Sequence, residues 1–378
     1  PYTAPELLLD PERAGARAGL YGFGATLYAL HLGRELTEDD APPERGGPRP
    51  FLDRFPDAHP LLARLIGKTF CREPGARFPS DEYVLEDPSG FAELAAALAA
   101  CGRQLGRYRP EIACWTSTGI ARGGNEDAVA VLQASRGLKD EFEDAAVLIL
   151  ADGMGGMDHG EVAAALTVEA LREFFLALPP FAGPGPDSGC RWGEEAPADS
   201  GADDWEQRVA EALREANRRV FEAARRGPGP ARMGSTAEVV YLDGRRAVVG
   251  HVGDSRVYRL HGGVLTQVTR DQTLVSRLVE LGQLTPAEAA RHPRRSELRQ
   301  AIGGRRDVDP AVSVVPLRPG DWLLVCSDGL TEELPPERIR EVLREAPSAE
   351  RAARRLVNEA NRAGAADNVT VIVVRAAG

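Results

Sequence analysis

The chain has 378 residues, of which 43% are hydrophobic, and it carries a formal net charge of −11 at neutral pH. The length suggests two or three domains of ordinary globular composition, and the negative charge argues against nucleic-acid binding through bulk electrostatics. No apolar run is long enough to span a membrane and no leader pattern opens the chain. The five cysteines are odd in number and include no Cys-x-x-Cys pair, which indicates free thiols in a reducing cytoplasm.

Residues 1–104 are predicted to be helical. Apolar residues recur at helical spacing from Leu20 to Leu30 and from Leu61 to Phe70, and Phe91 to Ala100 is rich in Ala and Leu. We expect a basic linker over residues 105–111. The beginning of the chain is therefore predicted to be a small all-α segment.

Three features of this segment resemble the C-terminal lobe of protein kinases. They are Ala4-Pro5-Glu6, the buried helix at Leu20 to Leu30, and Arg77 in the turn after the helix that ends near Phe70. The resemblance implies a buried ion pair between Glu6 and Arg77. The Gly-rich loop, strand lysine, His-Arg-Asp loop and Asp-Phe-Gly motif that a kinase needs do not occur in this segment, so we expect no kinase activity from it. We expect the tail of a longer kinase-phosphatase fusion, or a gene product that starts late. A helical domain of unrelated origin is the alternative.

Residues 112–378 are predicted to combine strands and helices. Consecutive short strands joined by tight turns favour antiparallel sheets. The stretch 179–204 is rich in Pro, Gly, Asp and Glu and is expected to be a disordered surface insertion. The predicted strands are 112–118, 237–242, 247–252 and 256–260, with a last strand that ends near 374, and the predicted helices are 162–178, 205–224, 271–281, 336–344, 348–363 and one that starts at the Thr285 cap and ends by His292-Pro293.

Acidic residues stand at the ends of several apolar strands. Asp152-Gly153 and Asp328-Gly329 each follow such a strand, Asp367-Asn368 precedes one, and Glu126-Asp127 precedes another. A single Asp-Gly would be an ordinary turn, but the repetition changes this interpretation. If these ends meet in space, the carboxylates repel one another unless cations neutralise them. Oxygen ligands without a His or Cys cluster indicate Mg²⁺ or Mn²⁺.

These motifs, in this order, resemble those of the metal-dependent type 2C serine/threonine protein phosphatases (the PPM family) in their bacterial form. The resemblance covers residues 113–375. It implies an α+β fold in which a β-sandwich of two antiparallel sheets is flanked by helices, with a mobile flap over 271–293. It also implies phosphorylated proteins as substrates and a cognate serine/threonine kinase as a partner. The motifs are Arg122 with Asn125-Glu126-Asp127, Asp152-Gly153-Met154-Gly155-Gly156 with Gly160-Glu161, Gly234-Ser235-Thr236-Ala237, Gly253-Asp254-Ser255-Arg256, Ser327-Asp328-Gly329-Leu330 and Asp367-Asn368.

The metal ligands follow from this resemblance as a hypothesis. Two divalent ions about 3.5 to 4 Å apart lower the pKa of a bridging water and stabilise charge on the phosphoryl oxygens. Asp152 would bridge both ions, and Asp328 with Asp367 would complete the first. The ligands of the second would be the carbonyl of Gly153 and, through water, Glu126 and Asp127.

Arg122 would hold the substrate phosphate, because a guanidinium matches two phosphate oxygens. Asp254 with Asp328 would hold the third, weaker ion of bacterial members. One departure concerns the leaving group, since eukaryotic members carry His where this chain has Met154. Methionine cannot donate a proton, so water would have to serve.

Three other residues that look reactive are interpreted as structural. His159 lies in a turn before a helix, His251 is expected to be a satisfied strand histidine, and Ser255 is expected to steady the loop that carries Asp254. Two alternatives to a phosphatase with kinase substrates remain open. One is a catalytically silent signalling scaffold, and the other is a phosphatase that acts on a regulator of transcription factors.

Overall fold

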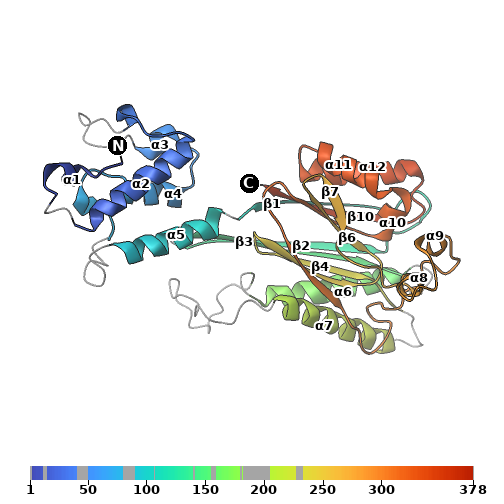
Figure 1. Ribbon diagram of the computed structural model, residues 1–378. Helices are drawn as coiled ribbons and strands as arrows, with labels where there is room; N and C mark the ends of the chain where they lie inside the picture. Colours follow the sequence, from blue (N-terminus) through green and yellow to red (C-terminus); the bar gives the residue numbers. More distant parts are fainter. Residues whose placement is uncertain are drawn as a thin grey trace. The chain divides into compact units, whose positions relative to one another are not determined.

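The computed structural model describes most of the chain (Figure 1), namely residues 2–11, 15–40, 50–79, 90–105, 107–138, 141–154, 159–178, 181, 205–226 and 233–377. The chain divides into two compact units, 1–106 with 137–142 and 107–136 with 143–378. Apart from Phe181, the insertion predicted over 179–204 lies outside the described residues, as do Gly155 and Gly156. Among the described helices, none combines the length and the apolar character that a membrane span requires.

The first unit is helical. The longest of its central helices, α2, packs against α4 through Gly24, where an added Cβ would lie 2.4 Å from Thr69 Oγ1. A ring cluster that includes Tyr28, Phe51 and Phe70 fills the space beside this contact. The elements are α1 (Pro5–Leu9), α2 (Arg17–Leu32), η1 (Glu38–Asp40), α3 (Phe51–Arg54), α4 (Pro60–Thr69), η3 (Pro74–Ala76) and α5 (Phe91–Leu105).

The predicted ion pair between Glu6 and Arg77 is confirmed. Arg77 Nη1 lies 2.5 Å from Glu6 Oε1, and the Arg77 side chain is fully buried. The same guanidinium donates to the carbonyl oxygens of Arg17, Cys71 and Arg72. Because every donor group of Arg77 has an acceptor, its burial leaves no unpaired charge in this unit.

The second unit contains two antiparallel sheets, which confirms the predicted fold. One sheet has the strand order β1-β10-β9-β6-β7 and the other β2-β3-β4-β5-β8. The strand predicted over 112–118 is β1, which lies at the edge of its sheet and pairs along its whole length with β10. The strands are β1 (Arg109–Ser117), β2 (Asp127–Leu138), β3 (Glu141–Asp152), β4 (Ala237–Leu242), β5 (Arg246–Val252), β6 (Arg256–His261), β7 (Val264–Gln267), β8 (Ala311–Pro316), β9 (Trp322–Cys326) and β10 (Val369–Ala377).

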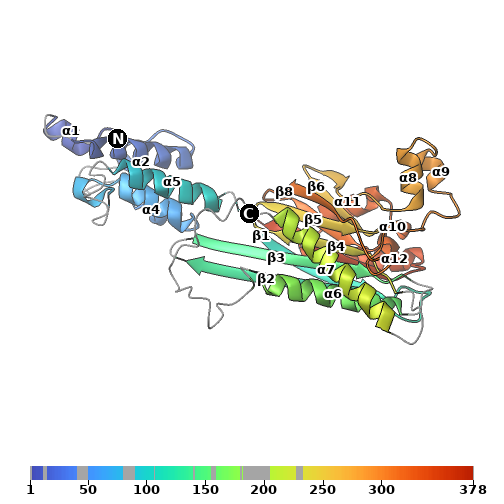
Figure 2. The ribbon, with the colours of Figure 1, turned by 90° about the horizontal axis from the view of Figure 1, so that it is seen from below.

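Helices cover the outer faces of both sheets. Figure 1 shows α6 and α7 on one side of the sheets and α11 and α12 on the other, and Figure 2 shows α6 and α7 along the sheet that contains β2 and β3. Alternate residues of β3 serve two cores. Val147 and Ile149 pack toward α6 and α7, whereas Leu148 and Leu150 pack between the sheets. The helices are α6 (Gly160–Leu176), α7 (Trp205–Arg226), α8 (Leu274–Glu280), α9 (Pro286–Ala289), α10 (Asp328–Glu333), α11 (Pro336–Glu345) and α12 (Ala349–Ala363).

Several element boundaries differ from the expectations. The linker expected over 105–111 is shorter, because α5 extends to Leu105 and β1 begins at Arg109. Helix α8 begins after Thr273, whose side chain caps it, rather than at Asp271. The Thr285 cap of α9 is present as a full capping box, but this helix already ends at Ala289. Strands β7 and β8 and the short helix α10 were not predicted, since they are short and their exposure does not follow a clean alternation.

Candidate active site

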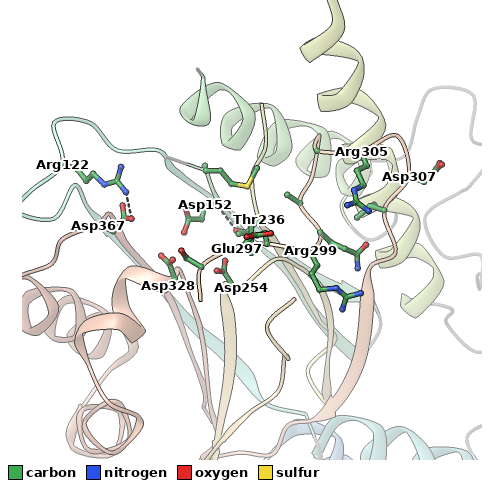
Figure 3. Close-up of a pocket in the computed structure, with 18 residues that line it drawn as sticks. Arg122, Asp152, Thr236, Asp254, Glu297, Arg299, Arg305, Asp307, Asp328 and Asp367 are labelled. Atoms are coloured by element: carbon green, nitrogen blue, oxygen red, sulfur yellow. Dashed lines mark hydrogen bonds and ion pairs between the residues drawn. The ribbon is translucent and has the colours of Figure 1, made fainter. Parts of the chain in front are cut away.

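Four separated segments deliver aspartates to one pocket (Figure 3). Asp152 ends β3, Asp254 lies in the turn between β5 and β6, Asp328 opens α10 directly after β9, and Asp367 precedes β10. These side chains line a pocket of about 560 Å³ together with Gly153 and Arg122. Six of the eight residues predicted to form the site therefore line a single cavity: Arg122, Asp152, Gly153, Asp254, Asp328 and Asp367.

The other two predicted residues, Glu126 and Asp127, are not among the residues that line the cavity. Asp127 accepts a hydrogen bond from Ser327 Oγ at 3.0 Å. Its other oxygen, Oδ1, is buried without a hydrogen-bond partner among the described residues. The backbone N–H of Glu126 donates to Asn368 Oδ1 at 2.8 Å. A buried carboxylate oxygen without a donor is costly, so Asp127 is well suited to meet a cation or its water.

Close backbone contacts explain two of the glycines. A Cβ on Gly153 would lie 2.4 Å from the Gly160 carbonyl oxygen and 2.8 Å from that of Glu126. A Cβ on Gly329 would lie 2.1 Å from the Asn368 carbonyl oxygen. At both positions a side chain would force the backbone segments apart. Glycine therefore lets the segment of Asp152 approach that of Glu126, and the segment of Asp328 approach that of Asp367.

A chain of hydroxyl groups holds Asp152 in place. The Asp152 N–H donates to Thr236 Oγ1 at 3.0 Å, and the Asp152 carbonyl accepts from the Thr236 N–H at 2.8 Å. The Thr236 hydroxyl lies 2.8 Å from Ser255 Oγ, which is fully buried beside Asp254. The expectation that Ser255 steadies its loop is thus confirmed, and it links the segments of Asp152 and Asp254.

The side chain of Asn368 connects three backbone segments of the site, a role that the sequence did not predict. Its side-chain amide donates to the carbonyl oxygens of Thr118 and Gly124 at 3.0 and 2.9 Å, while its Oδ1 accepts from Glu126. These bonds fix the loop that carries Arg122 against the segment that carries Asp367. The only sequence signal was an Asn placed between an acidic residue and a buried strand.

The pKa values of the site carboxyls are raised. Burial raises the pKa of Asp127 and of Asp254 to about 6 each. Burial, reinforced by the charge of Asp254, raises the pKa of Asp328 to about 8. The pKa of Asp152 is raised in the same way, by burial and then by the charge of Asp328. The site therefore concentrates negative charge that the pocket itself does not neutralise.

These residues fit a hard divalent cation. The donors are all oxygen atoms, several carboxylates share one small volume, and one buried oxygen has no donor. No three acidic, His or Cys side chains in the described part of the chain stand close enough to enclose an ion as they are placed. Like charges repel, so carboxylates close around an ion only when that ion is present to neutralise them.

Arg122 lies at the edge of this acidic group. Its Nη2 is 2.7 Å from Asp367 Oδ2, and both side chains are partly exposed to solvent. Figure 3 shows this pair on one side of the pocket. The guanidinium is thus placed beside the carboxylates, where it can meet an anion that approaches from solvent.

The opposite wall was not predicted. It is formed by residues 296–301, 304, 305, 307 and 308, which follow the segment expected to be the flap, and it includes Arg299, Arg305 and Asp307. Met154 lines the pocket between the two walls. A stretch with several arginines was visible in the sequence, but nothing local indicated that it would face Asp152.

His251 is a structural residue, as predicted. Its Nδ1 lies 2.5 Å from Glu238 Oε1 on the neighbouring strand, and its Nε2 lies 2.9 Å from the Arg270 carbonyl oxygen. Both side chains are buried. Neither lines the pocket, and neither does His159, which precedes α6.

Comparison with known proteins identifies the family of this chain. The family model described as protein phosphatase 2C matches residues 125–367. This chain belongs to the protein phosphatase 2C family. The serine/threonine protein phosphatase PstP of Mycobacterium tuberculosis is 35% identical over 255 residues, which is 68% of this chain but 43% of PstP. A putative protein phosphatase 2C-type protein of Streptococcus pyogenes is 32% identical over 265 residues, which is 70% of this chain and 96% of that protein.

Solved structures of the family superimpose on the second unit. The catalytic domain of PstP in complex with two manganese ions is 32% identical, with a TM-score of 0.56, and the match covers 71% of this chain and 99% of that one. A phosphatase of Mycobacterium smegmatis in complex with cacodylate is 30% identical, with a TM-score of 0.54, and the match covers 71% of this chain and 98% of that one. The part of the chain that matches is thus a protein phosphatase 2C domain, and the related domain of PstP has been solved with two manganese ions.

Proposed function

We propose that this chain hydrolyses phosphoserine and phosphothreonine in proteins, with Mn²⁺ or Mg²⁺ in the pocket. One observation carries the proposal. Aspartates from four segments line one cavity, and the guanidinium of Arg122 contacts one of them, Asp367. Asp152 and Asp328 have raised pKa values that a bound cation would lower again. Such a site is built to bind cations first and then an anionic ester.

The residues of the chain would divide the work as follows. Asp152, Asp328 and Asp367 would hold the two principal ions, with the Gly153 carbonyl and, through water, Glu126 and Asp127 as further ligands, and Asp254 with Asp328 would hold a third. Bound divalent ions supply an acidified water as nucleophile and stabilise charge on the phosphoryl group. Arg122 would exchange its contact with Asp367 for two phosphate oxygens and so orient the ester.

The proton for the leaving oxygen would come from water. Of the described residues that line the pocket, none is His, Cys, Lys or Tyr. The Met154 thioether carries no proton to donate. The ionisable groups of the described lining are therefore carboxylates and guanidinium groups, and the acid would be solvent.

The test is hydrolysis of a phosphothreonine peptide by the full chain with Mn²⁺, with EDTA, and with the variant Asp328→Asn. We expect phosphate release that needs Mn²⁺ and falls about 10³-fold or more in the variant. If the folded chain takes up Mn²⁺, seen as a rise in melting temperature, yet releases no phosphate, the catalytic proposal is wrong and the signalling scaffold replaces it.

We also propose that the helical unit derives from the C-terminal lobe of a protein kinase, and that a serine/threonine kinase is a partner of the phosphatase domain. Support comes from the contact between Arg77 and Glu6, which lie 71 positions apart and were paired from the kinase resemblance alone. Co-purification of a kinase by the full chain, lost in a variant without residues 1–104, would test the partnership.

The thiols of Cys71, Cys101, Cys114 and Cys326 are free, which supports the proposed cytoplasmic location.

A further inference from the structure

The pocket has a second cationic end. Arg299 and Arg305 line it together with Gln300, and Figure 3 shows both arginines on the side of the acidic group away from Arg122. One cavity therefore joins two cationic ends with the aspartates between them. The metal-dependent reaction accounts for the aspartates and for Arg122, but not for this second end.

The backbone that carries the two arginines is firmly anchored. The Arg299 N–H donates to the Gln272 carbonyl at 2.8 Å, and the Arg305 carbonyl accepts from Asn217 Nδ2 at 3.1 Å. The Asn217 side chain is 1% exposed and also accepts from the Gly303 N–H. Both arginines are thus held at fixed places by buried contacts, so binding an anion there would order the side chains only.

The same segment is tied to the metal end. Ile302, fully buried between the two arginines, exchanges two backbone hydrogen bonds with Ser235, at 2.9 and 3.1 Å. Ser235 in turn forms a bridge with Gly153, next to Asp152. Two short steps through the backbone therefore connect the second cationic end to the proposed metal ligands, and the separation between the two ends is set by the fold.

The charges at this end are available to a ligand. No carboxylate in the described part of the chain forms an ion pair with Arg299 or Arg305. Glu297, an acid of the same segment, is already paired with Arg294 at 2.5 Å. Asp307 is the one further acid of this wall, so the guanidinium groups outnumber it. The chain as a whole carries −11, so this local positive charge is the part of the pocket that would attract an acidic peptide.

The positive surface continues beyond the pocket. A neighbouring hollow shares Asp307 and Val308 with it and is lined by side chains of α7 and by Arg306. Within that hollow Arg218 is paired with Glu215 and Glu222, and the other guanidinium groups there are those of Arg214, Arg225 and Arg306. A peptide that leaves the pocket past Arg305 would therefore meet further positive charge.

We propose that Arg299 and Arg305 form a second anion subsite, which selects phosphopeptides that carry another anionic group near the scissile phosphate. The chemistry required of that group is a carboxylate or a second phosphate. This inference rests on the proposed phosphatase function, because it concerns the substrate of the same pocket. The extra anion would lie two to four residues from the phosphorylated one, about 7 to 13 Å along an extended peptide.

The experiment compares phosphothreonine peptides that differ at one position, where they carry Ala, Glu or phosphoserine, placed on either side of the phosphothreonine. The full chain with Mn²⁺ is expected to prefer an anionic peptide over the Ala peptide about five- to tenfold in kcat/KM, through KM and not kcat. In the double variant Arg299→Ala with Arg305→Ala this ratio should fall to about one. The double variant Arg299→Lys with Arg305→Lys should keep most of it. The matched control is Arg344→Ala, an exposed arginine on α11, which should keep the whole ratio.

Using a ratio of two peptides separates this proposal from a general loss of catalysis. A wild-type ratio near one, or a double variant that keeps the preference, would overturn the subsite. The Glu and phosphoserine arms distinguish an acidic residue from a second phosphate as the group that is read. If no peptide is hydrolysed at all, the proposed function fails. Fluorescence anisotropy of the same peptides on the wild-type chain in EDTA then decides the subsite, since equal affinities for the anionic and Ala peptides would refute it.

Discussion

The carboxylates of the helical unit and those of the pocket lie in opposite electrostatic environments. In the helical unit, hydrogen bonds from Arg34 hold the pKa of Asp40 far below its usual range, and Arg54 adds a further bond. Burial alone would raise the pKa of Glu6, but the hydrogen bonds from Arg77 outweigh it and the pKa is lowered. In the phosphatase unit, burial raises the pKa of Asp328 to about 8.

The difference separates carboxylates that serve the fold from those that serve the reaction. The acids of the helical unit have their counter-charges within the chain, so they hold helices and turns together. Asp152 and Asp328 form no ion pair with any described residue, and the guanidinium of Arg122 contacts Asp367 instead. An uncompensated group of buried acids destabilises the fold until a cation arrives, and it is retained because the cation is needed.

The largest effect is expected for Asp328→Asn. The change removes one charge from the repelling group without changing its size, so kcat/KM should fall about 10³-fold or more. In EDTA the variant should melt at the same temperature as the wild type or a higher one. Added Mn²⁺ should stabilise the folded wild type by about 2.7 kcal/mol at a hundred times its Kd, and so raise its melting temperature. The melting temperature of the variant should rise much less. A variant that melts lower than the wild type in EDTA would contradict the contrast.

Arg77→Met, unlike Asp328→Asn, should lower the stability of the fold. It leaves Glu6 and three carbonyl groups without their donor, so the helical unit should lose about 3 kcal/mol of unfolding free energy. Urea denaturation followed by the fluorescence of a Trp introduced at Tyr21 would measure the loss. Glu6→Gln is the matched control and should cost less, because Glu6 is partly exposed. Equal losses for the two variants would show that the charge pair, and not the carbonyl contacts, dominates.

Arg122→Ala tests the guanidinium that contacts Asp367. Without it, KM for a phosphopeptide should rise about tenfold or more, because two hydrogen bonds to the phosphate are lost. Mn²⁺ should bind at least as tightly as in the wild type, since Asp367 loses the arginine that competes for it. Isothermal titration with Mn²⁺ measures this, and weaker metal binding would argue that Arg122 supports the fold of the site instead.

Glu238 offers a smaller, intermediate case, a buried acid compensated by a histidine. Burial raises the pKa of Glu238 to about 7, and although burial alone would lower the pKa of His251, the charge of Glu238 raises it. The folded chain therefore holds more protons than the unfolded one, so this contribution to stability is present at low pH and is lost as the pH rises through about 7. Glu238→Gln should flatten the fall in melting temperature between about pH 5 and pH 8, measured in EDTA for both proteins. An unchanged slope would place the titration elsewhere.

Much of the site could be predicted from the sequence because its chemistry stands at element boundaries. An apolar run followed by Asp-Gly identifies the end of a buried strand at Asp152 and at Asp328. Together with Asp367, which precedes a strand, these acids predicted a cation site. Helix caps such as Thr285 are equally local, because a side chain bonds to a backbone group three residues away. These features depend only on neighbours in the sequence.

The tertiary structure decided what depends on residues far apart in the sequence. Ser327 meets Asp127 across 200 positions, Asn368 joins the loops of Arg122 and Asp367, and Gly153 is required by the approach of Gly160. The same holds for Arg299 and Arg305, whose place opposite Arg122 depends on pairing between Ile302 and Ser235. Local propensity cannot encode such contacts, because they arise when separate strands and loops pack into one core and their side chains come to share one pocket.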